Sequence, residues 1–151
     1  MRALVVYESM FGNTERVAQA ITHGLATRMA ASATPVTSFP ATPFAQPDLL
    51  VVGAPTHGLT LPTPDTRQQA AVRSDDEIDT RTGIREFLAA LPPVPGCLVA
   101  TFDTRHRRMR YLPGSAARAA GRLLDRAGCR MVMPAQSFYV AGMAGPLLPG
   151  E

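Results

Sequence analysis

Short runs of consecutive apolar residues alternate along this chain with segments in which apolar residues recur every three or four positions. Continuous runs of this kind are typical of strands that are covered on both faces of a sheet. The predicted strands are Ala3–Tyr7, Pro35–Phe39, Leu49–Gly53, Cys97–Phe102 and a last, interrupted strand made of Met131–Met133 and Ser137–Val140.

The helical pattern is clearest directly after the first strand. Val17, Ile21 and Leu25 are four residues apart and predict an amphipathic helix over Thr14–Arg28. Further helices are predicted at Ile84–Leu91, before Pro92, and at Ala116–Ala127, between the capping Ser115 and Gly128. Strands that alternate with helices indicate a single α/β domain over residues 1–151, with a parallel sheet and helices on both faces.

Three segments depart from a regular alternation. The Pro40–Asp48 link is short and holds three prolines, so we expect its helix to be absent or vestigial. No helical pattern follows Ser137–Val140, so the last covering helix is missing, and the sheet face is bare, covered by a partner or second copy, or covered by a longer natural chain. Leu59–Gly83 lacks clear periodicity, and its acidic cluster Ser74–Glu77 is interpreted as an exposed loop rather than a metal site.

Composition narrows the class of protein. Apolar residues make up 46% and charged residues 18% of the chain, as in soluble globular proteins. No apolar run reaches membrane-spanning length, and the N-terminus lacks the pattern of a secretory signal. Cys97 and Cys129 form no metal or redox motif. We therefore expect a cytoplasmic protein with two reduced, buried cysteines and no membrane partner.

The stretch between the first strand and the first helix carries the clearest candidate chemistry. Helix N-termini leave backbone N–H groups unpaired and favour a phosphate group. Gly12 allows close approach of the backbone, while Ser9, Asn13 and Thr14 offer side-chain donors. The pattern matches neither a Walker loop nor the Gly-x-Gly-x-x-Gly fingerprint. A phosphate site and a simple helix cap by Asn13 or Thr14 both remain open on these residues alone.

The segment Ser9–Glu15, which includes Met10 and Phe11, resembles the FMN-phosphate loop of the flavodoxin family, especially that of flavodoxin-type domains in multidomain flavoproteins. The resemblance implies a doubly wound, five-stranded parallel sheet with strand order 2-1-3-4-5 and non-covalently bound FMN. Phe11 stands where simple flavodoxins usually have a hydroxyl residue, so one phosphate contact is expected to be missing.

The same resemblance assigns a second loop to the flavin ring. Pro55, Thr56, His57 and Gly58 follow the third strand, and Gly58 would supply a backbone carbonyl that turns toward flavin N5. His57 either stacks on the ring or donates to it; a solvent-facing histidine is the alternative.

A third loop would close the other side of the ring. The resemblance implies contacts from Thr101, Phe102, Asp103 and Arg105, with Asp103 as a partner for flavin N3–H. Phe102 or Tyr111 would form an aromatic wall; alternatively, Phe102 completes the strand in the core. Flavodoxins usually have acidic residues here, whereas this chain has four arginines, at 105, 107, 108 and 110.

This basic loop has consequences for both potential and partners. A unit charge about 8 Å from the ring contributes roughly 1 kcal/mol at an effective dielectric of about 40, which would make the bound flavin less strongly reducing. The loop would also dock an acidic redox partner. Binding of nucleic acid is the disfavoured alternative, because the basic run is short and no nucleic-acid-binding motif is present.

Three functions compete at this point. The leading hypothesis is an FMN protein that transfers electrons between redox partners, since no residue set indicates substrate catalysis. The second is an FMN-dependent reductase of quinones that uses NAD(P)H, with Leu59–Gly83 as a lid and His57 as a proton donor. The third is an interaction module that keeps the fold but has lost the flavin.

Overall fold

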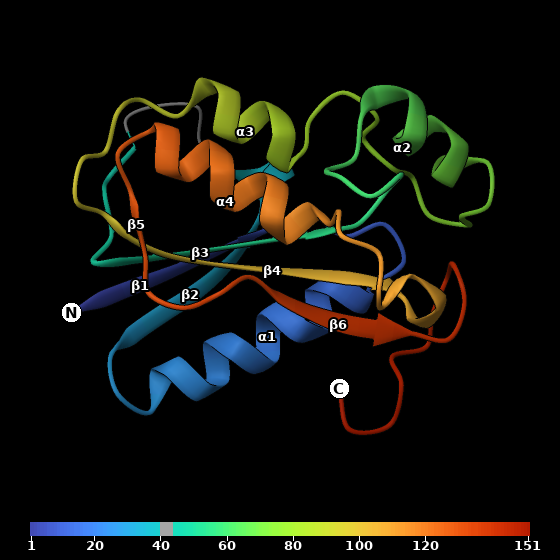
Figure 1. Cartoon of the computed structure of the whole chain (residues 1–151), viewed down its shortest axis with the longest axis horizontal. Coiled ribbons are helices and arrows are strands. Elements are labelled where there is room, and N and C mark those ends of the chain that lie inside the picture. Colours follow the sequence, from blue (N-terminus) through green and yellow to red (C-terminus); the bar gives the residue numbers. More distant parts are fainter. Residues whose placement is uncertain (40–43) are drawn as a thin grey trace.

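Parallel strands cross the centre of the molecule in the order β2-β1-β3-β4-β5, as Figure 1 shows for the computed structural model, which describes residues 1–39 and 44–151. The strands are β1 (Arg2–Tyr7), β2 (Ala30–Pro35), β3 (Leu49–Pro55), β4 (Leu98–His106), β5 (Arg130–Met131) and β6 (Gln136–Val140). Both β5 and β6 pair with β4, at its beginning and at its end respectively. Together they occupy the fifth strand position, which confirms the predicted order and the interrupted last strand.

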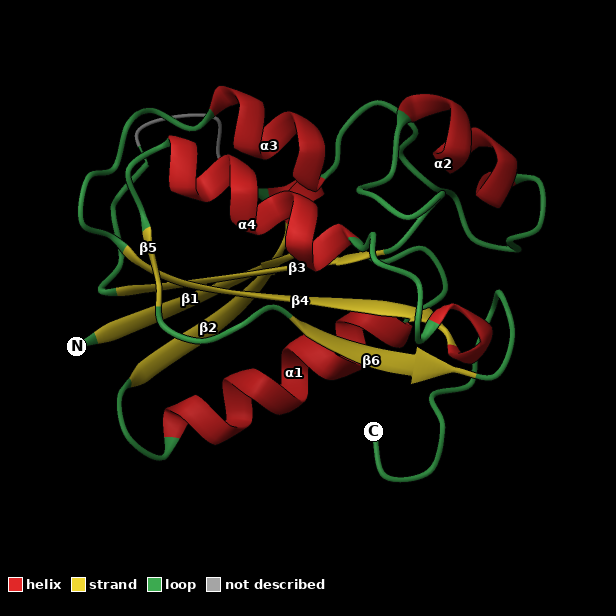
Figure 2. Cartoon of the chain, in the orientation of Figure 1, coloured by secondary structure: helices red, strands yellow, loops and turns green. Residues whose placement is uncertain are grey.

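Helices cover the two faces of this sheet (Figure 2). The helix α1 (Asn13–Ala26) packs on one face, where Val17 and Ala18 meet Val5, Val51 and Phe102. The helices α3 (Ile84–Ala90) and α4 (Ala116–Arg126) pack on the other face. Their core contacts include Val52, Ile84 and Leu124, all fully buried. Successive strand residues point to opposite faces, which explains why strands buried on both sides consist of continuous apolar runs.

The structure corrects three predicted elements. The predicted strand at Pro35–Phe39 is wrong, because β2 ends at Pro35 and Val36–Ser38 forms a 3₁₀ turn. The strand predicted to end at Phe102 continues as β4 to His106. The stretch without periodicity contains a helix, α2 (Pro64–Ala71).

The two helices that we expected to be absent or vestigial are also not found among the described residues. The 3₁₀ turn at Val36–Ser38 is the only regular element found there between β2 and β3. Residues 40–43 of the predicted Pro40–Asp48 link lie outside the described part of the chain. After β6, the described residues contain no further helix.

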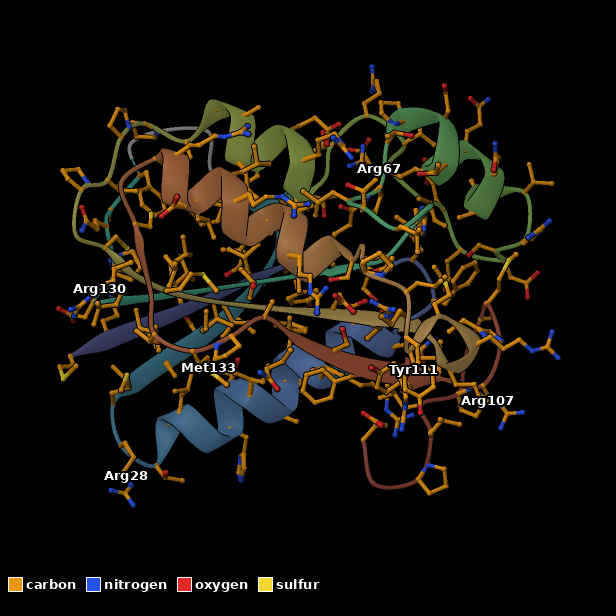
Figure 3. All side chains as sticks on the ribbon, viewed as in Figure 1. Arg28, Arg67, Arg107, Tyr111, Arg130 and Met133 are labelled. Carbon is orange, nitrogen blue, oxygen red and sulfur yellow. The ribbon has the colours of Figure 1, made fainter. Side chains whose placement is uncertain are left out.

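A cluster of buried ion pairs connects α2 to the rest of the fold. The guanidinium of Arg67 is 0% exposed; its Nε donates to Oε1 of Glu8 at 2.6 Å and its Nη2 donates to Oε2 of Glu86 at 2.7 Å. The backbone N–H of Ile84 donates to Oε2 of Glu8 at 2.9 Å. Figure 3 shows Arg67 between α2 and the other helices of that face. The end of β1 and the starts of α2 and α3 are therefore held together by one side chain.

Two features are absent from the described residues. None of their helices combines the length and the apolar character needed to cross a membrane. They also contain no group of three or more histidine, cysteine, aspartate or glutamate side chains placed to hold a metal ion.

Candidate functional site

Unpaired backbone donors mark the N-terminus of α1. Gly12 precedes the helix with φ of 86°, a left-handed conformation that favours glycine. Its N–H donates to Oγ of Ser9 at 3.1 Å, and the helical bonds begin with the N–H of Arg16 donating to the Gly12 carbonyl. In the described parts of the chain, nothing accepts a hydrogen bond from the N–H groups of residues 13–15. This end of the helix can therefore bind an anion.

A cavity of about 280 Å³ opens beside this turn, at the edge of the sheet where the parallel strands end. This is the place where open α/β sheets bind ligands. Of the predicted site residues, those that line it are Ser9, Met10, Phe11, Asn13, Thr14, Pro55, Thr56, His57, Gly58 and Arg105. The structure thus brings the first two predicted loops together around one space.

Four predicted residues do not line the cavity. Gly12 lies on the turn without facing this space, whereas Thr101, Phe102 and Asp103 are buried within β4. The ring of Phe102 packs edge-on against Phe138 with 6.2 Å between the centroids. Because β4 runs past its predicted end, the loop that reaches the cavity begins later than expected, and Thr104, His106 and Met109 line the cavity instead.

Asp103 has a structural partner instead of a ligand-facing position. Its side chain is fully buried, and its Oδ2 accepts the backbone N–H of Ala117 at 3.1 Å, in the first turn of α4. Burial raises the pKa of this carboxyl. Asp103 therefore caps α4, and the expected hydrogen bond to a flavin N3–H does not fit its placement.

The four arginines of the third loop divide into two groups. Arg105 is only 4% exposed and lines the cavity, while Arg107, Arg108 and Arg110 are exposed to solvent. Figure 3 shows Arg107 and Tyr111 at the outer end of the molecule, beyond β4. The predicted basic loop is therefore one buried cation and a separate exposed patch.

His57 contributes a neutral ring to the cavity. Its Nδ1 lies 2.9 Å from Oγ1 of Thr66. Burial lowers the pKa of His57, and the positive charge of Arg67 lowers it further. At neutral pH the imidazole is therefore uncharged and presents one donor or acceptor to a ligand.

The helix α2 supplies a cavity wall that sequence reasoning missed. Thr66, Gln69 and Ala70 line the cavity from this helix, and Arg73 lines it from just beyond the end of the helix. Nη1 of Arg73 donates to the sulfur of Met143 at 2.6 Å, across the mouth of the site. The helix start could have been recognised from Thr63, which caps it, followed by Pro64 at its first position.

A second hollow, of about 820 Å³, lies on the other side of the turn that precedes α1. Its charged lining is mainly acidic: Glu8, Glu15, Asp76, Glu77 and Asp79, with Arg81 as the basic member. By contrast, the ionisable residues of the first cavity are His57, Arg73, Arg105 and His106, and no carboxylate of the described residues lines it. An anionic ligand on the α1 N-terminus is therefore favoured in the first cavity.

Comparison with known proteins supports the architecture. No protein-family model matches the chain, and no curated protein matches it. Among solved structures, a flavodoxin of Streptococcus pneumoniae TIGR4 is 17% identical with a TM-score of 0.69, and the match covers 94% of this chain and 87% of that chain. Oxidised Flavodoxin 2 from Bacillus cereus is 20% identical with a TM-score of 0.68, covering 93% and 86%.

A larger protein shows the same likeness over part of its length. The Flv1 flavodiiron core from Synechocystis sp. PCC6803 is 21% identical with a TM-score of 0.61, and the match covers 93% of this chain but 31% of that chain. At these identities the matches show a shared fold, with the same strand order as the one described above.

Proposed function

We propose that this chain, which has the flavodoxin-like fold, binds FMN non-covalently and transfers electrons between redox partners. One observation carries the proposal: the unpaired N–H groups of residues 13–15 open beside a cavity that is lined by arginines and histidines and by no carboxylate of the described residues. This arrangement suits a ligand with a phosphate at one end. The cavity volume of about 280 Å³ is close to the lower end of the usual range for small-molecule sites.

Different parts of the site would bind the phosphate and the ring of FMN. The N-terminus of α1 would hold the phosphate, and Thr14, whose hydroxyl lies 2.7 Å from that of Thr104, fixes the start of the helix to β4. The segments Pro55–Gly58 and Thr104–Met109 would enclose the ring from two sides. Bound flavin supplies the electron-transfer chemistry, while the protein sets its binding and its potential.

The exposed patch made of Arg107, Arg108, Arg110 and Tyr111 supports an acidic redox partner. It adjoins His106 and Met109, which line the cavity, and the side chain of Tyr111 is 92% exposed. The guanidinium of Arg110 lies 4.4 Å from the centre of the Tyr139 ring, which leaves its charge near the surface. Electrostatic attraction of this kind raises association rates at low salt. Electron transfer to an acidic acceptor protein should therefore slow as ionic strength rises, and a salt-independent rate would count against this docking face.

We also propose that the protein acts in the cytoplasm. Cys97 and Cys129 are free and buried, and burial together with its neighbour Cys97 raises the pKa of Cys129 to about 11. Such thiols are unreactive and need no oxidising compartment. Labelling of the two thiols only after denaturation would support this reduced state.

An FMN-dependent reductase is the second candidate function. The observation that favours it is the neutral His57 in a cavity that α2 partly covers. Steady turnover of NAD(P)H with a quinone by the purified protein alone would favour the enzyme over the electron carrier. Absence of turnover with flavin bound would favour the carrier.

The decisive experiment is titration of the protein with FMN, followed by the quenching of flavin fluorescence. Gly12 does not face the cavity, but Gly12→Asp adds a negative charge next to the unpaired N–H groups of residues 13–15 and should strongly weaken binding of the phosphate. Gly12→Asn is the matched control, because asparagine tolerates the left-handed conformation and adds no charge. If wild-type protein fails to quench flavin fluorescence, the chain is an interaction module and the proposed function is wrong.

A further inference from the structure

Arg105 is a buried cation without an anionic partner among the described residues. Its Nη1 donates to the carbonyl of Gly114 and its Nη2 to the carbonyl of Leu112, both at 3.1 Å. Its Nε is buried and, within the described parts of the chain, has no hydrogen-bond partner. Both ion pairs found in those parts involve Arg67, so Arg105 is not neutralised by a carboxylate contact there.

The surroundings of Arg105 offset its charge only in part. Asp103, two positions away on the same strand, makes no ion pair with Arg105: its Oδ2 accepts the N–H of Ala117 in α4. Burial raises the pKa of Asp103 by more than the charge of Arg105 lowers it, so Asp103 offsets that charge only in part. The side chains that share the cavity with Arg105 include Arg73, His57 and His106, none of which is an anion. Burial of a charge without a partner is costly, and a guanidinium keeps its proton at all physiological pH values. An anionic ligand in the cavity that Arg105 lines would therefore complete the neutralisation of its charge.

We infer that Arg105 stabilises the negatively charged, two-electron reduced state of FMN in this cavity relative to the oxidised state. The inference rests on the proposed function and assigns one residue to the control of the flavin potential. A bound flavin would take up two electrons from a redox partner and one proton from solvent, which would give its neutral oxidised ring one negative charge. Arg105 forms and breaks no covalent bond and transfers no proton; it acts only through its charge.

The exposed arginines of the same loop should contribute less. Arg107, Arg108 and Arg110 are open to solvent, where water and salt screen their charges. Arg105 is 4% exposed, so its charge acts through protein rather than through water. One residue, rather than the whole basic loop, should therefore account for most of the shift.

The test measures two properties of the FMN-loaded protein: the dissociation constant of oxidised FMN and the two-electron midpoint potential, with dithionite as reductant and reference dyes. In Arg105→Gln and Arg105→Met we expect the ratio of reduced to oxidised flavin affinity to fall about tenfold, which lowers the midpoint potential by about 30 mV. Two neutral variants are used, so that if one of them folds poorly the other still tests the inference. Arg105→Lys retains the charge and should restore most of the potential.

Arg118→Gln is the matched control. Arg118 is exposed on α4, and its Nη1 donates to the carbonyl of Pro113 at 2.6 Å, so it resembles Arg105 in hydrogen bonding but does not line the cavity. Its replacement should leave the potential unchanged. Equal potentials in wild type, Arg105→Gln and Arg105→Met, all with FMN bound, would overturn this inference alone. Failure of the wild-type protein to bind FMN would overturn the proposed function and this inference together.

Discussion

Arg67 and Arg105 are both buried arginines near the edge of the sheet where the strands end, and they differ in their partners. Arg67 contacts two carboxylates, Glu8 and Glu86, and its charge is neutralised within the protein. Arg105 contacts two backbone carbonyls and lines a cavity to which the described part of the chain contributes no carboxylate. The difference indicates that Arg67 stabilises the fold, whereas Arg105 is placed to bind an anionic ligand.

Replacement of Arg67 should produce the largest effect. Arg67→Met leaves the carboxylate of Glu8, which is 6% exposed, without its cation. Removing one partner of a buried ion pair costs about 3–5 kcal/mol. Denaturant unfolding should report this loss, with the exposed Arg16→Met as the control that changes little. A loss below about 1 kcal/mol would contradict a structural role for Arg67.

Replacement of Arg105 should cost less stability in the absence of ligand. Arg105→Met removes hydrogen bonds to two loop carbonyls but breaks no ion pair found in the described parts, and Asp103 loses only the more distant charge of Arg105. We expect a loss of about 1–2 kcal/mol in the free energy of unfolding. The same unfolding experiment checks it. A loss equal to that of Arg67→Met would remove the distinction between the two arginines.

The two carboxylates around Arg67 should contribute unequally to the free energy of unfolding. The side chain of Glu86 is 34% exposed, whereas that of Glu8 is 6% exposed. Water can replace part of the contact at Glu86, so Glu86→Gln should cost only about 1 kcal/mol. Glu8→Gln should cost more, because Glu8 also accepts the N–H of Ile84. Equal unfolding energies for the two variants would show that burial does not decide between them.

The pH dependence of His57 should be the smallest effect. Burial and then Arg67 lower the pKa of His57 in the folded protein below the ordinary value of 6.5. The stabilising contribution of the neutral ring is therefore fully present above about pH 6.5, the value of the unfolded chain, and is lost as pH falls through the lower folded pKa. NMR titration of the His57 ring protons should give a midpoint below 6.5. A midpoint at or above 6.5 would show that the ring is more hydrated than its position indicates.

Arg67 links this last prediction to the first. Its positive charge is the second cause of the lowered pKa of His57. In Arg67→Met protein that retains its fold, the His57 midpoint should move toward 6.5. An unchanged midpoint would leave burial as the only cause.

Local sequence patterns were sufficient to predict the elements at the centre of the fold. The strands β1 and β3 and the helix α1 follow from continuous apolar runs and a four-residue apolar spacing, which depend only on neighbours in sequence. The β1–α1 turn was predicted for the same reason, since Gly12 and its polar neighbours precede the helix directly. The edge strand β2 was misplaced because Ala30–Pro35 consists mostly of small residues, while the more apolar Val36 and Phe39 lie just beyond it.

Tertiary contacts decided the rest of the site. The polar residues Asp103, Thr104 and Arg105 extend β4, and their hydrogen-bond partners are α4, Thr14 and loop carbonyls, none of which is adjacent in sequence. The sequence shows four arginines near one loop, but only the folded chain buries Arg105 and exposes its neighbours. Likewise, Arg67 lies 59 residues from Glu8, and only the packing of α2 against the end of β1 pairs them. A side chain's burial and partners depend on distant segments, so they become known only when the sheet and its helices are assembled.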